Sequence, residues 1–215
     1  MYLVRTPSAV QNLFPNFTWR IPGAEKELFL TFDDGPIPEV TPWVIEQLAA
    51  YDAKATFFCV GENAFRSPDL MHSLHEAGHI TGNHTFNHLS GWTSEHVPYL
   101  HNVRKCAPLV QTNLFRPPYG RIRPRQAQFI MRHYQIVMWD VLSADFDGSI
   151  SPEQCLKNVT TNAGPGSIVV LHDSLKAETN LRYALPRILD HFAEAGYTFN
   201  ALSEIAEFSK IRVSA

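Results

Sequence analysis

The chain has 215 residues, of which 45% are hydrophobic, and a formal net charge of -3 at pH 7. This length accommodates one large α/β domain or two small ones, and the apolar fraction is typical of a globular protein. A slightly acidic chain without a basic cluster argues against nucleic acid or an anionic membrane surface as the main partner.

The three cysteines, Cys59, Cys106 and Cys155, are far apart, odd in number and form no C-x-x-C pair. We therefore expect buried thiols rather than a disulfide framework or a cysteine-rich metal site. Residues 1–19 lack the apolar core of a signal peptide, and no stretch approaches about 18 consecutive apolar residues. The expectation is a cytoplasmic protein without a membrane span, unless a leader has been removed.

Residues 1–26 contain Pro7, Pro15 and Pro22 and are expected to wrap irregularly around the outside of the molecule. A single domain is expected over residues 27–208, followed by a tail at 209–215. Within the domain, short apolar runs alternate with helical patterns. The runs predict seven strands, at 27–32, 55–60, 79–83, 113–116, 136–140, 167–171 and 197–200.

Helices are predicted between the strands, at 41–51, 67–78, 94–111, 123–133 and 185–195, with another beginning at Ser151. Thr41-Pro42, Ser67-Pro68 and Ser151-Pro152 each resemble an N-cap followed by proline at the first helical position. Pro186 must lie in the first turn of its helix or kink it. The alternation favours an α/β fold with a parallel sheet, closed as a barrel because no second core is evident. Ligands should then gather at the carboxyl ends of the strands.

The first strand ends in two adjacent carboxylates, Asp33 and Asp34, followed by the Gly35-Pro36 break. Two negative charges side by side repel each other and need a cation, a hydrogen-bond donor or bulk water. A solvated turn is the alternative interpretation, since aspartate and glycine are common in turns.

The third strand is followed by His84 and His88, four residues apart. On one side of a helical turn, both imidazoles could reach a single metal ion. Two surface histidines on a loop are the alternative, in a chain that contains 10 histidines.

Three further polar residues follow predicted strands. Arg116 precedes Pro117-Pro118, which fix the backbone, so its guanidinium is suited to holding a carboxylate; a structural turn is the alternative. Asp145 follows the fifth strand, and His172 closes an apolar strand, where a core histidine is the alternative. Because all these groups fall at one predicted rim, they indicate a common site.

These motifs resemble the NodB-homology polysaccharide deacetylases, carbohydrate esterase family 4, which are metal-dependent hydrolases on a distorted (β/α) barrel. The resemblance covers roughly residues 27–206. Its five motifs correspond in order to 31–35, 84–88, 116–119, Asp145 and His172. Two positions depart from the family pattern: Phe146 replaces a tryptophan and Val170 replaces a leucine. Both family positions line the acyl pocket.

The resemblance implies a metal site of Asp34, His84 and His88, with Asp33 as general base and His172 as general acid. One carboxylate and two neutral imidazoles suit a divalent ion, zinc first, with cobalt, nickel or iron as alternatives. From the residues alone, the two aspartates cannot be ranked, and the bend at Gly35-Pro36 must aim both inward.

The resemblance also implies supporting roles around this centre. Arg116 would orient Asp33, Asp145 would anchor Arg116 or raise the pKa of His172, and the backbone N–H of Tyr119 would stabilise an oxyanion. The expected substrate-lining residues are Trp92, Phe146, Val170 and Leu171. Trp139 is expected to pack in the core.

The expected activity is removal of an N-linked group, N-acetyl first, from an amino sugar or oligosaccharide. Two alternatives remain open: hydrolysis of a small cyclic or linear amide, and glycan binding without catalysis. A complete set of base, acid and metal ligands argues against the last.

Overall fold

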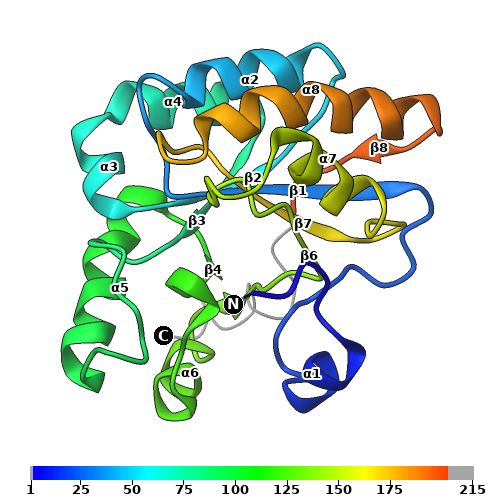
Figure 1. The fold of residues 1–215 in the computed structure, drawn as a ribbon. Helices are drawn as coiled ribbons and strands as arrows, with labels where there is room; N and C mark the ends of the chain where they lie inside the picture. Colours follow the sequence, from blue (N-terminus) through cyan, green and yellow to red (C-terminus); the bar gives the residue numbers. More distant parts are fainter. Residues whose placement is uncertain (1, 203–215) are drawn as a thin grey trace.

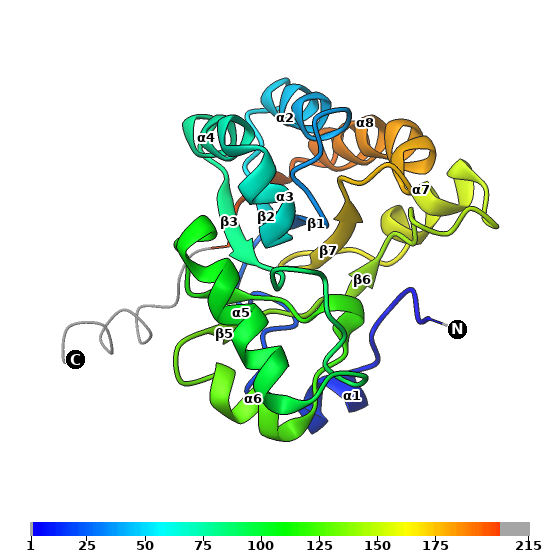
Figure 2. The same ribbon diagram turned by 90° about the vertical axis from the view of Figure 1, so that its left-hand side faces the viewer.

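The computed structural model describes residues 2–202 and consists of one curved, mainly parallel sheet with helices packed outside it (Figures 1 and 2). The strand order is β5-β4-β3-β2-β1-β7-β6, with β8 paired to β1. The strands are β1 (Glu27–Asp33), β2 (Thr56–Cys59), β3 (Ile80–Asn83), β4 (Leu114–Phe115), β5 (Gln135–Ile136), β6 (Val141–Leu142), β7 (Ile168–His172) and β8 (Thr198–Phe199). The predicted single-domain (β/α) barrel is confirmed as an incompletely closed one. The predicted tail at 209–215 lies outside the described residues.

The helices follow the strands in the order that parallel pairing requires. They are α1 (Ser8–Leu13), α2 (Thr41–Ala49), α3 (Gly61–Arg66), α4 (Pro68–Glu76), α5 (His96–Val110), α6 (Pro124–Ile130), α7 (Pro152–Thr160) and α8 (Glu178–Glu194), with a 3₁₀ turn η1 (Pro118–Gly120). In both ribbon views, α2, α4 and α8 lie along the same side of the sheet (Figures 1 and 2).

Several helix starts differ from the predictions. Ser151 caps α7 as expected, accepting a hydrogen bond from the Gln154 N–H at 3.2 Å. Thr41 is instead the first residue of α2, where its hydroxyl accepts a hydrogen bond from the Ile37 N–H. Helix α8 begins at Glu178, well before the predicted start, so Pro186 lies in its interior.

Side chains alternate between the two faces of the central strands, and each face contributes to a different hydrophobic core. Leu28, Leu30 and Phe32 face the outer helices and join the main apolar cluster. Phe29 faces the barrel interior with Phe58, and Thr31 and Asp33 continue on that inner side. The periodicity that buries β1 on both faces therefore also directs Asp33 inward.

Only Ile136 of the predicted strand at 136–140 lies in a strand: β5 ends there, β6 begins at Val141, and these two short strands form the two edges of the sheet. The N-terminal segment occupies the gap between them: it bridges Thr18 to Val137 in parallel and Arg5 to Val141 in antiparallel. Backbone hydrogen-bonding groups that would have paired the two edges and closed the barrel are thus bound by residues 4–21. This segment also contains α1, which the proline-rich sequence did not suggest.

Leu171 does not line the substrate cavity, contrary to expectation. It is fully buried in the outer core with Val169, whereas Val170 and His172 point to the opposite side of β7. The period-two alternation of a strand explains this, since neighbours cannot both face the interior.

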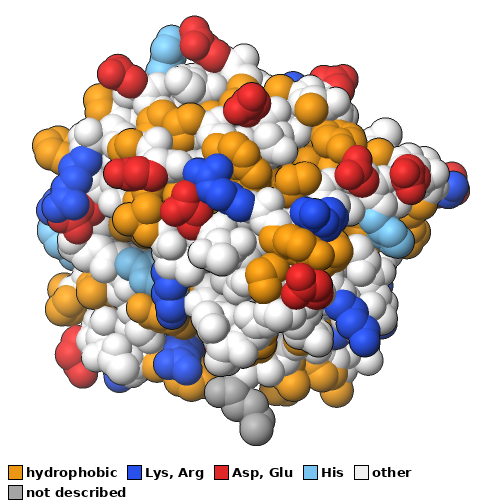
Figure 3. Space-filling view, turned by 45° about the horizontal axis from the view of Figure 1, so that its top comes forward, with side chains coloured by type: hydrophobic (Ala, Val, Ile, Leu, Met, Phe, Trp, Pro, Cys, Tyr) orange, Lys and Arg blue, Asp and Glu red, His pale blue; other side chains and the backbone are white. Residues whose placement is uncertain are grey.

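The cysteines, the charged side chains and the helix lengths of the described residues are as the composition led us to expect. All three cysteines are free and buried. Acidic and basic side chains are mixed on the face above α2 and α8 (Figure 3), so no region of one sign dominates there. Among residues 2–202, no helix combines the length and the apolar character needed to cross a bilayer.

Replacing Leu171 by alanine should lower the free energy of unfolding by about 3 kcal/mol, because it leaves a cavity in a fully buried core. Urea denaturation followed by circular dichroism measures this loss. Leu175→Ala is the matched control, since Leu175 is 60% exposed and its replacement should change stability by less than about 0.5 kcal/mol. Unchanged stability in Leu171→Ala would contradict the assignment to the core.

Candidate metal and catalytic site

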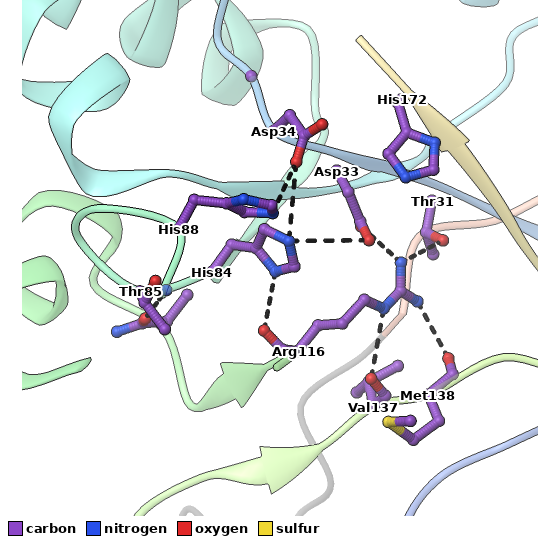
Figure 4. Close-up of polar contacts among 12 residues, drawn as sticks. Thr31, Asp33, Asp34, His84, Thr85, His88, Arg116, Val137, Met138 and His172 are labelled. Atoms are coloured by element: carbon purple, nitrogen blue, oxygen red, sulfur yellow. Dashed lines mark hydrogen bonds and ion pairs between the residues drawn. The ribbon is translucent and has the colours of Figure 1, made fainter. Parts of the chain in front are cut away.

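Asp34, His84 and His88 converge at the carboxyl ends of β1 and β3 (Figure 4). One ligand atom from each residue lies within 4.8 Å of the others. Asp34 Oδ1 is 3.2 Å from His88 Nε2 and 3.8 Å from His84 Nε2. One carboxylate oxygen and two imidazole nitrogens at this spacing fit a divalent transition metal and leave coordination positions for other ligands.

His84 is prepared for this role by its surroundings. Its Nδ1 lies 2.8 Å from the carbonyl oxygen of Arg116, to which it donates in the neutral ring, leaving Nε2 directed at Asp34. Burial lowers the pKa of His84 to about 4, against the opposing effect of Asp33. The ring is therefore neutral near pH 7, as a metal ligand must be.

Asp34 is held as a carboxylate. Burial alone would raise its pKa, but the hydrogen bond with His88 and the positive charge of His172 outweigh burial and hold the pKa well below its ordinary value. Its backbone has a φ of 83°, a left-handed conformation that redirects the side chain after the strand. This turn explains how two consecutive aspartates both face the site.

His84 and His88 lie on a loop, so the expected helical turn is wrong although both rings reach the triad. Thr85 and His88 have φ values of 64° and 53°, which fold the loop back on itself. Asn83 and Asn102 fix it with their side-chain oxygens: Asn83 accepts from the Thr85 N–H, and Asn102 accepts from the N–H groups of residues 86 and 87.

Arg116 is fully buried beneath the triad and orients Asp33. Its Nη1 donates to Asp33 Oδ1 at 2.7 Å and to Thr31 Oγ1 at 2.8 Å. Its remaining donors reach the carbonyl oxygens of Val137 and Met138, in the break between β5 and β6. Figure 4 shows the guanidinium between Asp33 and these carbonyls.

His172 lies beside Asp33 on the neighbouring strand, in register with it. Asp145 accepts hydrogen bonds from the His172 Nδ1 and backbone N–H, both at 2.7 Å. Burial lowers the pKa of His172, but the Asp145 carboxylate, with smaller effects from Asp34 and Asp33, raises it to about 9. Of the two roles open for Asp145, the geometry favours support of His172 over anchoring of Arg116.

A cavity of about 1260 Å³ opens over the triad. Of the expected substrate-lining residues, Trp92, Phe146 and Val170 line it, as does Tyr119. Trp139, expected to be a core residue, lines it too. Part of its wall comes from the N-terminal segment, including Phe14 and Trp19, which no sequence pattern indicated because their contacts are long-range.

Asp173 is a supporting residue that the sequence analysis did not single out. It is completely buried, accepts a hydrogen bond from the Gly35 N–H at 3.1 Å and another from the Thr41 hydroxyl at 2.6 Å. A Cβ atom at Gly35 would lie 1.9 Å from Asp173 Oδ2, so the turn after Asp34 has room for glycine alone. Burial raises the pKa of Asp173 to about 8. The sequence could have indicated this residue, because Asp173, like Asp33, is an aspartate at the end of an apolar strand.

A (β/α) barrel whose strand ends hold an Asp-His-His triad between a buried carboxylate and a histidine has the architecture of a metal-dependent hydrolase. Comparison with known proteins specifies the family. The family model described as Polysaccharide deacetylase matches residues 20–138, and the chain belongs to this family.

Relatives whose names state an activity are deacetylases, in agreement with the family model. The chain is 34% identical over 198 residues to a peptidoglycan-N-acetylglucosamine deacetylase of Bacillus cereus, covering 89% of this chain and 93% of the relative. It is 35% identical over 162 residues to a chitooligosaccharide deacetylase of Azorhizobium caulinodans, covering 72% of this chain and 77% of the relative.

A solved structure supports the same fold. The crystal structure of a peptidoglycan N-acetylglucosamine deacetylase in complex with 4-naphthalen-1-yl-N-oxidanyl-benzamide superimposes with a TM-score of 0.83 at 29% identity. The match covers 92% of this chain and 95% of that chain.

Asp173→Ala should weaken metal binding by about tenfold or more, the usual cost of losing an outer-shell partner, because the turn carrying Asp34 loses its anchor. Zinc titration of the metal-free protein by calorimetry measures this. Asp173→Asn, which keeps an acceptor for the Gly35 N–H, should retain most of the affinity.

Asp140→Ala is the matched control, because Asp140 is also buried but binds Arg20, Ser167 and the Ile168 N–H instead. It should lose stability without losing metal affinity. Equal metal affinity in Asp173→Ala and wild type would refute the anchoring role.

Proposed function

We propose that this protein is a metal-dependent deacetylase that removes N-acetyl groups from N-acetylglucosamine residues of a glycan. One observation supports this above all: a carboxylate oriented by Arg116 and a histidine oriented by Asp145 flank one Asp-His-His triad on adjacent strands. Hydrolysis of an amide needs both a proton acceptor and a proton donor. The named activities of the relatives supply the N-acetylglucosamine substrate.

Asp34, His84 and His88 would hold the ion, for which we propose zinc. Such an ion supplies a Lewis acid that lowers the pKa of water and stabilises negative charge on a carbonyl oxygen. The chain's own residues then manage the protons. Asp33, aimed by the hydrogen bond from Arg116, takes a proton from the attacking water.

His172 gives a proton to the departing amine as the C–N bond breaks, so the products are acetate and a free amino sugar. An amine leaves poorly until it is protonated, which makes a high pKa on His172 useful. We assign to the backbone N–H of Tyr119, which lies in a turn with a φ of 61°, the role of donating a hydrogen bond to the oxyanion.

The size of the cavity favours a glycan substrate over a small amide. At about 1260 Å³ the cavity exceeds the usual range of small-molecule sites, about 300–1,000 Å³. Exposed aromatic rings at its mouth, Trp92 and Tyr119, offer faces on which sugars stack. A non-catalytic binder would not need Asp145 to keep His172 protonated.

Two substitutions should separate metal binding from proton transfer. His84→Ala removes a ligand, so bound zinc measured by plasma mass spectrometry should fall to near zero together with acetate release. His172→Ala should keep zinc but lose about 10²-fold or more in kcat, the usual size of general-acid catalysis.

Acetate release from N-acetylglucosamine oligosaccharides is the activity assay, and exposed His72→Ala is the control for both variants. Normal turnover in His172→Ala would exclude its role as the acid. Undiminished acetate release after complete chelation would exclude the metal step.

Asp145→Asn should move the alkaline limb of the pH profile downward. A general acid works only while protonated, so activity dependent on His172 is present below its pKa, raised to about 9, and lost above it. The variant removes the negative charge that raises this pKa, and the limb in kcat/KM should shift down by about 1–3 pH units. An unmoved limb would show that Asp145 does not set the protonation of His172.

A further inference from the structure

The charged groups of the cavity are unevenly distributed. Its two carboxylates are already engaged, Asp33 with Arg116 and Asp34 with the metal histidines. Its remaining charged lining residues, apart from histidines, are both cations, Arg121 and Lys176. In a chain with a net charge of -3, the described cavity therefore offers positive charge, not negative, to a ligand.

Arg121 lies next to the metal site through two ring contacts. Its Cζ is 5.9 Å from the ring centroid of Tyr119, whose ring is in turn 4.6 Å from that of His88. It is also 5.2 Å from the centroid of Trp92. The cation thus lies between Trp92 and Tyr119, the aromatic rings on which a sugar would stack.

The backbone holds Arg121 in this place. Its carbonyl oxygen accepts a hydrogen bond from the Gly91 N–H at 3.0 Å, which ties it to the loop carrying Trp92. Arg123 adds a second tie by donating to the Trp92 carbonyl oxygen at 2.7 Å. Arg121 forms no ion pair with any residue between 2 and 202. Its guanidinium lies over the two rings and is free to donate hydrogen bonds to a ligand.

Lys176 extends the positive charge to the acid side of the site. Its Nζ is 5.5 Å from the ring centroid of Phe146, which packs against His172. Asp147 lies near enough for Lys176 to help lower its pKa, but that carboxylate already accepts hydrogen bonds from the Tyr2 and Ser149 hydroxyls.

We propose that Arg121 binds a carboxylate on the substrate, so that the site prefers an acidic glycan whose carboxylate-bearing sugar adjoins the N-acetylated sugar being cleaved. A guanidinium edge matches a carboxylate with two parallel hydrogen bonds, whereas a neutral oligosaccharide offers hydroxyl and amide groups only. This inference rests on the proposed function. It bears on the two kinds of named relatives, because an N-acetylmuramic acid unit without attached peptide carries a carboxylate and chitooligosaccharide carries none.

The test compares one oligosaccharide in two forms. The first alternates N-acetylglucosamine with N-acetylmuramic acid, and the second is the same compound with its carboxylates converted to methyl esters. Wild type should favour the acid over the ester in kcat/KM by about tenfold, the scale of one charge-assisted hydrogen bond. Raised ionic strength should shrink this preference, since the contact is partly exposed.

Arg121→Gln should remove the preference, losing about tenfold in kcat/KM on the acid and less than twofold on the ester. Arg125→Gln is the matched control, because Arg125 is an exposed arginine of α6 that does not line the cavity. It should keep the preference. Equal losses on both substrates, or no loss on either, would overturn the carboxylate contact.

Calorimetric binding of both oligosaccharides to the metal-free protein separates this inference from the proposed function. If wild type deacetylates neither form, the proposed function fails. Tighter binding of the acid than of the ester, abolished in Arg121→Gln, would still establish the subsite. Equal binding of the two forms to wild type would overturn it.

Discussion

Arg116 carries a positive charge into the interior of the barrel, where none of its side chain is exposed. A buried charge is tolerable only when it is paired and fully hydrogen-bonded, and removing one partner of such a pair costs about 3–5 kcal/mol. Here Asp33 supplies the opposite charge, and Thr31, Val137 and Met138 supply oxygen acceptors. The contact also fixes the orientation of the carboxylate assigned as the base.

The hydrogen bonds of Arg116 lie where the sheet is incompletely closed. Two of the acceptors of Arg116 are carbonyl groups in the break between β5 and β6, which a continuous strand pairing would have used for its own ladder. The N-terminal segment forms hydrogen bonds with several other backbone groups at the gap and also forms a wall of the cavity. The irregular edge and the buried guanidinium are thus two aspects of one arrangement.

Three aspartates at strand ends acquire different roles from their partners. Asp33 faces Arg116, and Asp34 faces two histidines. Asp145 faces His172 and raises the pKa of that histidine. Asp173, which directly follows β7, joins the end of that strand to the end of β1, where Asp33 and Asp34 lie: its side chain accepts from the Gly35 N–H, and its backbone N–H donates to the Asp33 carbonyl oxygen at 3.2 Å. The acid side and the metal side are therefore mechanically connected, as well as close in space.

Local pattern was sufficient for the alternation of strands and helices, the single parallel sheet, and the set of polar residues at one rim, because hydrophobic periodicity and strand-end position are properties of short segments. The metal and acid–base residues came from motif resemblance, and the structure brings them together. Tertiary structure alone decided the rest: that Leu171 faces the core, that the strand ends at Ile136, that His84 and His88 meet on a loop, and that side chains of the N-terminal segment line the cavity. Each depends on contacts between residues far apart in the chain. The pattern of a short sequence segment carries no information about a partner that lies outside that segment.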